Sequence, residues 1–139
     1  MNSSKTKWAI VLAGVLIAAC ASNPYRVKLD GSEEVPPVNT SAKAKGEIVV
    51  KTDRTVSGQI AISGFTPTAA HIHNAPPGRN GPVIITLKKT GDDVFSVPEG
   101  AKLNEAQYAA YLAGNLYVNV HSPANPSGEV RTQIKPVTK

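Results

Sequence analysis

Apolar and polar residues alternate with a period of two along much of the chain after residue 26. Because successive side chains of a β-strand point to opposite faces, this alternation predicts strands with one buried face. The predicted strands are 27–29, 42–51, 55–62, 70–73, 116–121 and 129–135, with a short apolar run at 82–87 as a further one. The polar turn at 52–54 predicts that the second and third strands form a hairpin.

The apolar positions of these strands are expected to share one core. Its predicted members are Ile48, Val50, Ile60, Ile62, Ile72, Val118, Val120 and Ile134. Since 139 residues suffice for one ordinary domain, a single core is the natural arrangement.

One segment has a helical pattern instead. Asn104 and Gln107 have the spacing of a capping box, good helix formers follow, and Gly114 is a plausible stop. We therefore predict an all-β fold: an antiparallel Greek-key β-sandwich or barrel of about seven to eight strands, with one short helix near 104–113.

The N-terminus has the organisation of a secretory signal. Lys5 and Lys7 precede an uncharged apolar run at 8–19, which is too short for a comfortable membrane span. The run ends at Cys20 after an aliphatic and two small residues, a pattern that resembles the bacterial lipobox. An ordinary signal cleaved near Ala19, with Cys20 incidental, is the alternative.

The expected domain organisation follows from the lipobox. Residues 1–19 form a lipoprotein signal peptide, 20–26 a lipidated N-terminus and tether, and 27–137 the β-sandwich domain. Ala21 and Ser22 follow the cysteine where inner-membrane lipoproteins often carry Asp. The expected location is therefore the cell envelope, anchored by lipid to the outer membrane and facing the periplasm or the cell surface.

Charge and cysteine content exclude several classes. Cys20 is the only cysteine, so the domain has no internal disulfide and must be held by packing. Removing Lys5 and Lys7 with the signal lowers the formal charge from +5 to +3, and the remaining charges of both signs are interspersed. A surface of this kind, without aromatics on a basic patch, argues against a nucleic-acid partner.

Three histidines are the candidate metal ligands. His71 and His73 lie on one face of a predicted strand, opposite Ile72, and His121 lies on the non-core face of another. If the two strands are neighbours, three imidazoles can converge on one copper or zinc ion. The alternative is that the histidines are structural and hydrogen-bond the backbones of the long loops.

Other catalytic groups are scarce. The domain has no cysteine nucleophile, no Gly-x-Ser-x-Gly elbow and no Gly-rich phosphate loop, so we do not predict an enzyme. The acidic pairs at 33–34 and 92–93 are expected in solvated loops, because strand neighbours face opposite ways. Arg131 is either an anion-binding or supporting residue near the histidines, or a surface charge paired with Glu129 or Glu47.

Several motifs, in order along the chain, resemble the CHRD domain. They are LDGSEEVPPV at 29–38, AHIH at 70–73, PG at 77–78, NGPV at 80–83, GNLYVNVHS at 114–122 and PSGEVR at 126–131. The resemblance covers about 29–134. It implies an extracellular β-sandwich, secreted or lipidated in bacteria, more than any particular reaction.

A looser likeness is to Cu/Zn superoxide dismutase. The His-x-His strand, the later Val-His and the Arg after a Gly match His71, His73, His121 and Arg131 in order. The bridging histidine, the zinc loop and the disulfide have no counterpart here, which puts dismutase chemistry in doubt while leaving copper binding as the implied property.

These observations favour a CHRD lipoprotein that binds a transition metal, preferably copper, for metal handling or protection in the envelope. A non-catalytic module that binds another envelope protein, with structural histidines, is the alternative. A copper-dependent oxidoreductase is a third, minor hypothesis.

Overall fold

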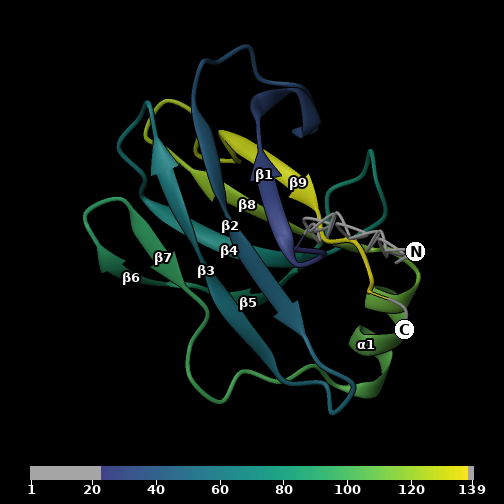
Figure 1. The fold of residues 1–139 in the computed structure, drawn as a ribbon. Helices are drawn as coiled ribbons and strands as arrows, with labels where there is room; N and C mark the ends of the chain where they lie inside the picture. The colour runs from purple at the N-terminus through teal and green to yellow at the C-terminus, as the bar shows by residue number, and fades with distance from the viewer. Residues whose placement is uncertain (1–22, 138–139) are drawn as a thin grey trace, which may run out of the picture.

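The computed structural model describes residues 23–137 as two β-sheets packed face to face, with one short helix at an end of the sheets (Figure 1). The predicted signal peptide and Cys20 lie outside the described residues. Within 23–137, no helix is both long and apolar enough to cross a bilayer.

One sheet has five strands in the order β1-β2-β3-β7-β6, and the other has four in the order β5-β4-β8-β9. The strands are β1 (Arg26–Leu29), β2 (Lys43–Val50), β3 (Val56–Ser63), β4 (Ala69–Asn74), β5 (Val83–Thr86), β6 (Lys88–Gly91), β7 (Val94–Ser96), β8 (Leu116–His121) and β9 (Val130–Gln133). All paired strands are antiparallel, and β2 and β3 form the predicted hairpin. The antiparallel sandwich is confirmed, whereas the barrel alternative is not, because the strands form two separate sheets.

The chain crosses between the sheets three times, from β3 to β4, from β5 to β6 and from β7 to β8. At one edge, Asp30 and Arg131 exchange backbone hydrogen bonds of 3.3 and 3.0 Å, which tie the end of β1 to β9. The strands β6 and β7 were absent from the sequence prediction. All four residues of β6 are exposed, so this edge strand lacks the apolar alternation that would reveal it.

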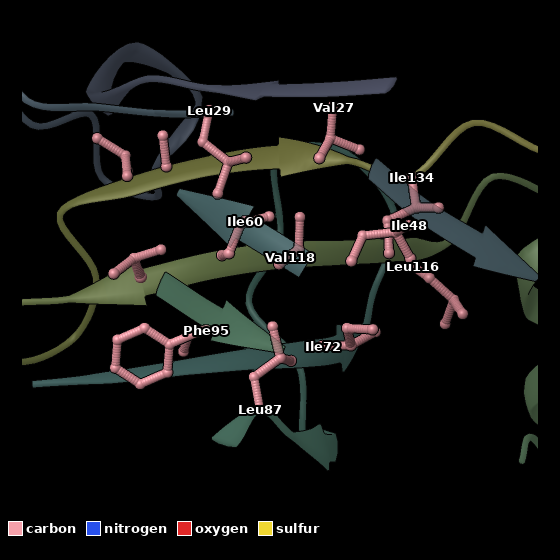
Figure 2. Close-up of a cluster of buried hydrophobic side chains, with 14 of the residues drawn as sticks. Val27, Leu29, Ile48, Ile60, Ile72, Leu87, Phe95, Leu116, Val118 and Ile134 are labelled. Carbon is pink, nitrogen blue, oxygen red and sulfur yellow. The ribbon is translucent and has the colours of Figure 1, made fainter. Parts of the chain in front are cut away.

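The core lies between the two sheets (Figure 2). Every residue of the predicted core is buried there, which confirms the period-two assignment. The two sheets contribute comparable aliphatic faces, for example Ile48 and Ile60 from one and Ile72 and Val118 from the other. Leu87, at the crossing from β5 to β6, and Phe95 of β7 complete it.

The predicted helix is α1 (Glu105–Leu112), and a single 3₁₀ turn, η1 (Gly31–Glu33), follows β1. The side chain of Asn104 accepts from the amide of Gln107, whose side chain accepts from the amide of Asn104, so the capping box is confirmed. Tyr111 is the buried residue that fastens the helix to the core.

A loop covers part of the outer face of the four-stranded sheet. Several hydrogen bonds hold the loop 75–82 to this face. Among them, Gln133 donates to the Ala75 carbonyl, Arg131 to the Arg79 carbonyl, and the Gly81 amide to the Tyr117 hydroxyl. Asn80 in turn donates to the Val35 carbonyl, which joins this loop to the segment after η1. Polar side chains of this face therefore satisfy backbone groups of the loop, as the structural alternative for the histidines anticipated.

Candidate metal centre

The three histidines come together on the covered face of the four-stranded sheet. His71 and His73 lie on β4, and His121 ends the neighbouring β8, where its Cα pairs with that of Ala69. One ring nitrogen from each histidine lies within 4.8 Å of the others. The Nδ1 of His71 and the Nε2 of His121 are 2.9 Å apart. The sequence pattern thus identified residues that the fold unites into one three-histidine cluster.

Hydrogen bonds to two loops decide which nitrogens are free. The Nδ1 of His73 lies 2.8 Å from the Gly81 carbonyl oxygen, and the Nδ1 of His121 lies 2.8 Å from that of Pro126. A carbonyl oxygen only accepts, so each Nδ1 carries the proton and each Nε2 presents a lone pair toward the cluster. This is how metal-ligating imidazoles are usually oriented by their second nitrogen. The structural role that the sequence left as the alternative is therefore present as well. In His73 and His121, the Nδ1 of the ring anchors a loop while the Nε2 faces the cluster.

Asn119 contributes an oxygen to the cluster. Its Oδ1 lies 3.0 Å from the Nε2 of His73 and 3.1 Å from the Nε2 of His121. With both Nε2 atoms unprotonated, lone pairs face one another at these contacts, and a cation bound between the three atoms would make the contacts favourable. Sequence reasoning missed this residue, although its place two positions before His121 on the same strand face was a usable signal.

Burial favours the neutral, metal-binding form of His71 and His73. The pKa of His71 is lowered first by burial and then by the nearby His121 and His73. The pKa of His73 is also lowered, mainly by burial and to a smaller extent by His121 and Arg131, against the raising effects of Gly81 and Asn119. His73 is only 8% exposed. Neutral imidazoles are the form that coordinates a metal.

Arg131 is a buried supporting residue and not a surface charge. It is 1% exposed, and its guanidinium donates to the Arg79 carbonyl at 2.8 Å and to the Asn80 side chain at 3.2 Å. Its Cζ lies 3.4 Å from the centroid of the Tyr117 ring, in cation–π geometry. The surface ion pair with Glu129 or Glu47 is therefore wrong.

Glu129 and Glu47 have other partners. The carboxylate of Glu129 accepts from Thr40, Ser122 and Asn125. That of Glu47, on the sheet opposite Arg131, accepts from Asn23, which precedes β1 on the same face as Glu47. Neither carboxylate is needed to explain the position of Arg131.

The expectation that the 33–34 pair is solvated is wrong for Glu34, which is buried. Only 5% of Glu34 is exposed, and its Oε1 has no hydrogen-bond partner among the described residues. Burial raises the pKa of Glu34 to about 7, against the lowering effects of the Arg131 charge and a hydrogen bond with Asn119. Gly128, at φ +143°, leaves room for this carboxyl, since a Cβ there would overlap it. Glu33 remains exposed as expected.

The cluster has the donors of a small, nitrogen-rich metal site. Three imidazole nitrogens and one amide oxygen converge from two adjacent strands, and two carbonyls fix the outer ring nitrogens. Such a donor set suits Cu(II) or Zn(II) rather than a hard cation such as Mg²⁺. Half-buried His71 and His121 give an ion access, while His73 closes the inner side.

The comparisons with known proteins bear on the whole of this fold. The family model described as CHRD domain matches residues 25–134, from the last residue before β1 to the residue after β9. No curated protein and no solved structure matches the chain.

Proposed function

The chain belongs to the CHRD domain family, and from that premise we propose that it is a cell-envelope lipoprotein that binds a transition metal through His71, His73 and His121. The metal is copper in preference to zinc. The protein handles metal in the envelope or protects envelope components from it, without catalysing a reaction.

The observation that carries the metal proposal is the pair of hydrogen bonds from His73 and His121 to the Gly81 and Pro126 carbonyls. They commit both Nδ1 atoms to donation and direct both Nε2 lone pairs toward His71 and Asn119. Purely structural histidines would need only one anchoring bond each. Here the second nitrogens also meet at one point.

Copper is favoured by the donor chemistry. For a site of nitrogen and oxygen donors, affinity among the first-row divalent ions rises to Cu(II) and falls again at Zn(II). The cluster has no thiolate to shift that preference toward Cu(I). Zinc is retained as the second metal, because three histidines and one further position also describe zinc sites.

The anchor is proposed from the sequence at Cys20, which follows the apolar run and ends a lipobox-like pattern. Stable anchoring requires more than one acyl chain, so a fully processed bacterial lipoprotein terminus is expected. The wild-type protein should fractionate with membranes, and Cys20→Ala should release it or leave it unprocessed. Recovery of unlipidated wild-type protein from the soluble periplasm would refute the anchor.

The metal proposal is tested by titrating the processed protein with Cu(II) and with Zn(II) at neutral pH, beside His71→Ala and the exposed-residue control Gln59→Ala. We expect one equivalent of Cu(II) to bind wild type and Gln59→Ala, with nitrogen hyperfine structure in the Cu(II) spin-resonance spectrum. The loss in His71→Ala should exceed the roughly 10–100-fold that changes outside the ligand set cost. Equal binding by wild type and His71→Ala would locate the metal elsewhere, and no binding by either would end the proposal.

The second candidate is a protein-interaction module whose histidines only fix loops. It is favoured by the same bonds to Gly81 and Pro126, read as structural. It predicts that His73→Ala destabilises the fold, that His71→Ala, which removes no bond to a loop carbonyl, does not, and that metal changes the stability of none of the proteins. A metal-dependent rise in the melting temperature of wild type alone decides for the first candidate.

A further inference from the structure

The outward face of β1 and β2, on the sheet opposite the histidines, is strongly basic. Arg26 and Lys28 project from β1, and Lys43 and Lys45 from β2, and all four are exposed. Glu47 is the one carboxylate on this part of the sheet. Lys28 and Lys45 are direct cross-strand partners, an arrangement of like charges that destabilises a sheet. A repulsive pair of this kind points to an anionic partner that relieves it.

The same face is hollowed in its centre. Gly46, Gly58, Ala61 and Ser96 carry small side chains or none, and they floor a shallow depression of about 840 Å³ rimmed by the basic residues. The face can therefore lie against a broad partner, with the long Lys and Arg side chains extending around the depression. Its charge selects an anionic partner.

The start of the described chain lies on this face. Asn23, which also lines the depression, donates to the Glu47 carboxylate at 2.7 Å. Cys20 is three residues earlier, and three extended residues span about 10 Å. A lipid on Cys20 would thus leave the domain next to its most basic surface.

We infer that this basic face of β1 and β2 docks on anionic phospholipid headgroups and orients the domain on the membrane. The inference rests on the proposed membrane anchorage and does not depend on the metal. Juxtamembrane basic residues are attracted by an anionic leaflet, each contributing roughly a fivefold gain in association that fades within a Debye length. With the five-stranded sheet against the lipid, the histidine cluster on the opposite sheet faces away from the membrane.

The test measures the acylation rate of individual lysines in the processed protein reconstituted in vesicles, read by peptide mass spectrometry. One set of vesicles contains phosphatidylethanolamine with phosphatidylglycerol, and the other has phosphatidylcholine in place of the anionic lipid. We expect Lys28, Lys43 and Lys45 to react several-fold more slowly on the anionic vesicles, and high salt to abolish the difference. Lys89 should react alike on both vesicles, because its strand partner is the inward-facing Phe95.

A pair of charge-matched variants completes the experiment. Lys28→Gln/Lys45→Gln should lose the protection of Lys43, while Lys89→Gln/Lys102→Gln should keep it. Removing the repulsive Lys28–Lys45 pair is not expected to impair folding, which circular dichroism verifies. Protection that is equal on neutral and anionic vesicles, or equal for Lys43 and Lys89, would overturn the inference. So would protection of the same lysines by a co-purifying protein without vesicles.

The outcomes separate this inference from the proposed function. The mass of the N-terminal peptide shows whether Cys20 is lipidated. A lipidated protein without lysine protection keeps the anchor and refutes the docking. An unlipidated protein whose basic lysines are protected when anionic vesicles are added keeps the docking and refutes the anchor. Copper binding by Lys28→Gln/Lys45→Gln should equal that of wild type in every case.

Discussion

The guanidinium of Arg131 lies on the ring of Tyr117, with Cζ 3.4 Å from the ring centroid. The His73 ring stacks on the same tyrosine, at 4.6 Å between centroids and 5° between planes. The Tyr117 hydroxyl accepts from the Gly81 amide, and the Gly81 carbonyl accepts from His73. Each of Tyr117, Gly81 and His73 therefore contacts the other two. As a result, the position of the loop 75–82 and the orientation of the His73 ring depend on each other.

The first prediction concerns Arg131. Arg131→Lys should lower the free energy of unfolding by about 2–4 kcal/mol, because an ammonium cannot reproduce the planar stack on Tyr117 and the forked donation to Arg79 and Asn80 while still burying a charge. Urea unfolding measures the loss. Arg26→Lys, at an exposed position, is the control and should change stability by less than about 0.5 kcal/mol. A loss no larger than in that control would show that the buried guanidinium is not a structural anchor.

The second prediction concerns Asn119. Asn119→Ala should weaken Cu(II) binding by roughly 10–100-fold, the scale of changes beside a metal ligand, because its oxygen faces the Nε2 atoms of both His73 and His121. The exposed Asn39→Ala is the control and should bind as wild type does. Calorimetric titration compares the variants at one pH. Wild-type affinity in Asn119→Ala would remove the amide oxygen from the site.

The third prediction concerns the pH dependence of copper binding. The pKa values of His71 and His73 are lowered, chiefly by burial, so both rings remain neutral to a lower pH than a free imidazole. Protons on these two rings compete with the metal only below those lowered pKa values. Cu(II) affinity should accordingly stay nearly constant as pH falls to about 6.5, the ordinary imidazole value, and decline below it. Titrations at a series of pH values measure the midpoint, and a midpoint above the ordinary value would contradict the buried-ligand geometry.

The fourth prediction concerns Glu34. Its folded-state pKa of about 7 lies above its ordinary value of 4.5, so the folded protein binds the proton more tightly than the unfolded chain does. The stability from this group is complete below about 4.5 and is lost as pH rises to about 7, with a total on the order of 2 kcal/mol after allowance for partial solvation. Glu34→Gln should remove this loss, so that the free energy of unfolding of the variant rises relative to that of wild type from pH 5 to pH 8.

The measurement is the difference in unfolding free energy between Glu34→Gln and wild type across that pH range. Taking the difference removes the opposite trend from His71 and His73, whose lowered pKa values make stability fall as pH drops. The exposed neighbour Glu33→Gln serves as the control. A difference that does not change with pH would show that Glu34 titrates as it does in the unfolded chain.

Local patterns in the sequence predicted much of the fold. The alternation around Ile48, Ile60, Ile72 and Val118 identified the strands and the core, because a strand exposes its side chains to two faces in strict turn. The capping box at Asn104 located the helix, since it depends on groups only three residues apart. The edge strand β6 was not predicted, because it buries no side chain and so lacks the apolar alternation.

By itself, the sequence determined seven of the strands, the helix and much of the core, and it placed His71 and His73 on one face with His121 in phase on another strand. Only the tertiary structure decided that β4 and β8 are neighbours and that the loop 75–82 covers this face. Arg131 is buried against that loop, and Glu34 is buried against Gly128, despite the charged character of both side chains. A period of two distinguishes the faces of a strand, whereas what covers a face depends on hydrogen bonds between segments far apart in the chain.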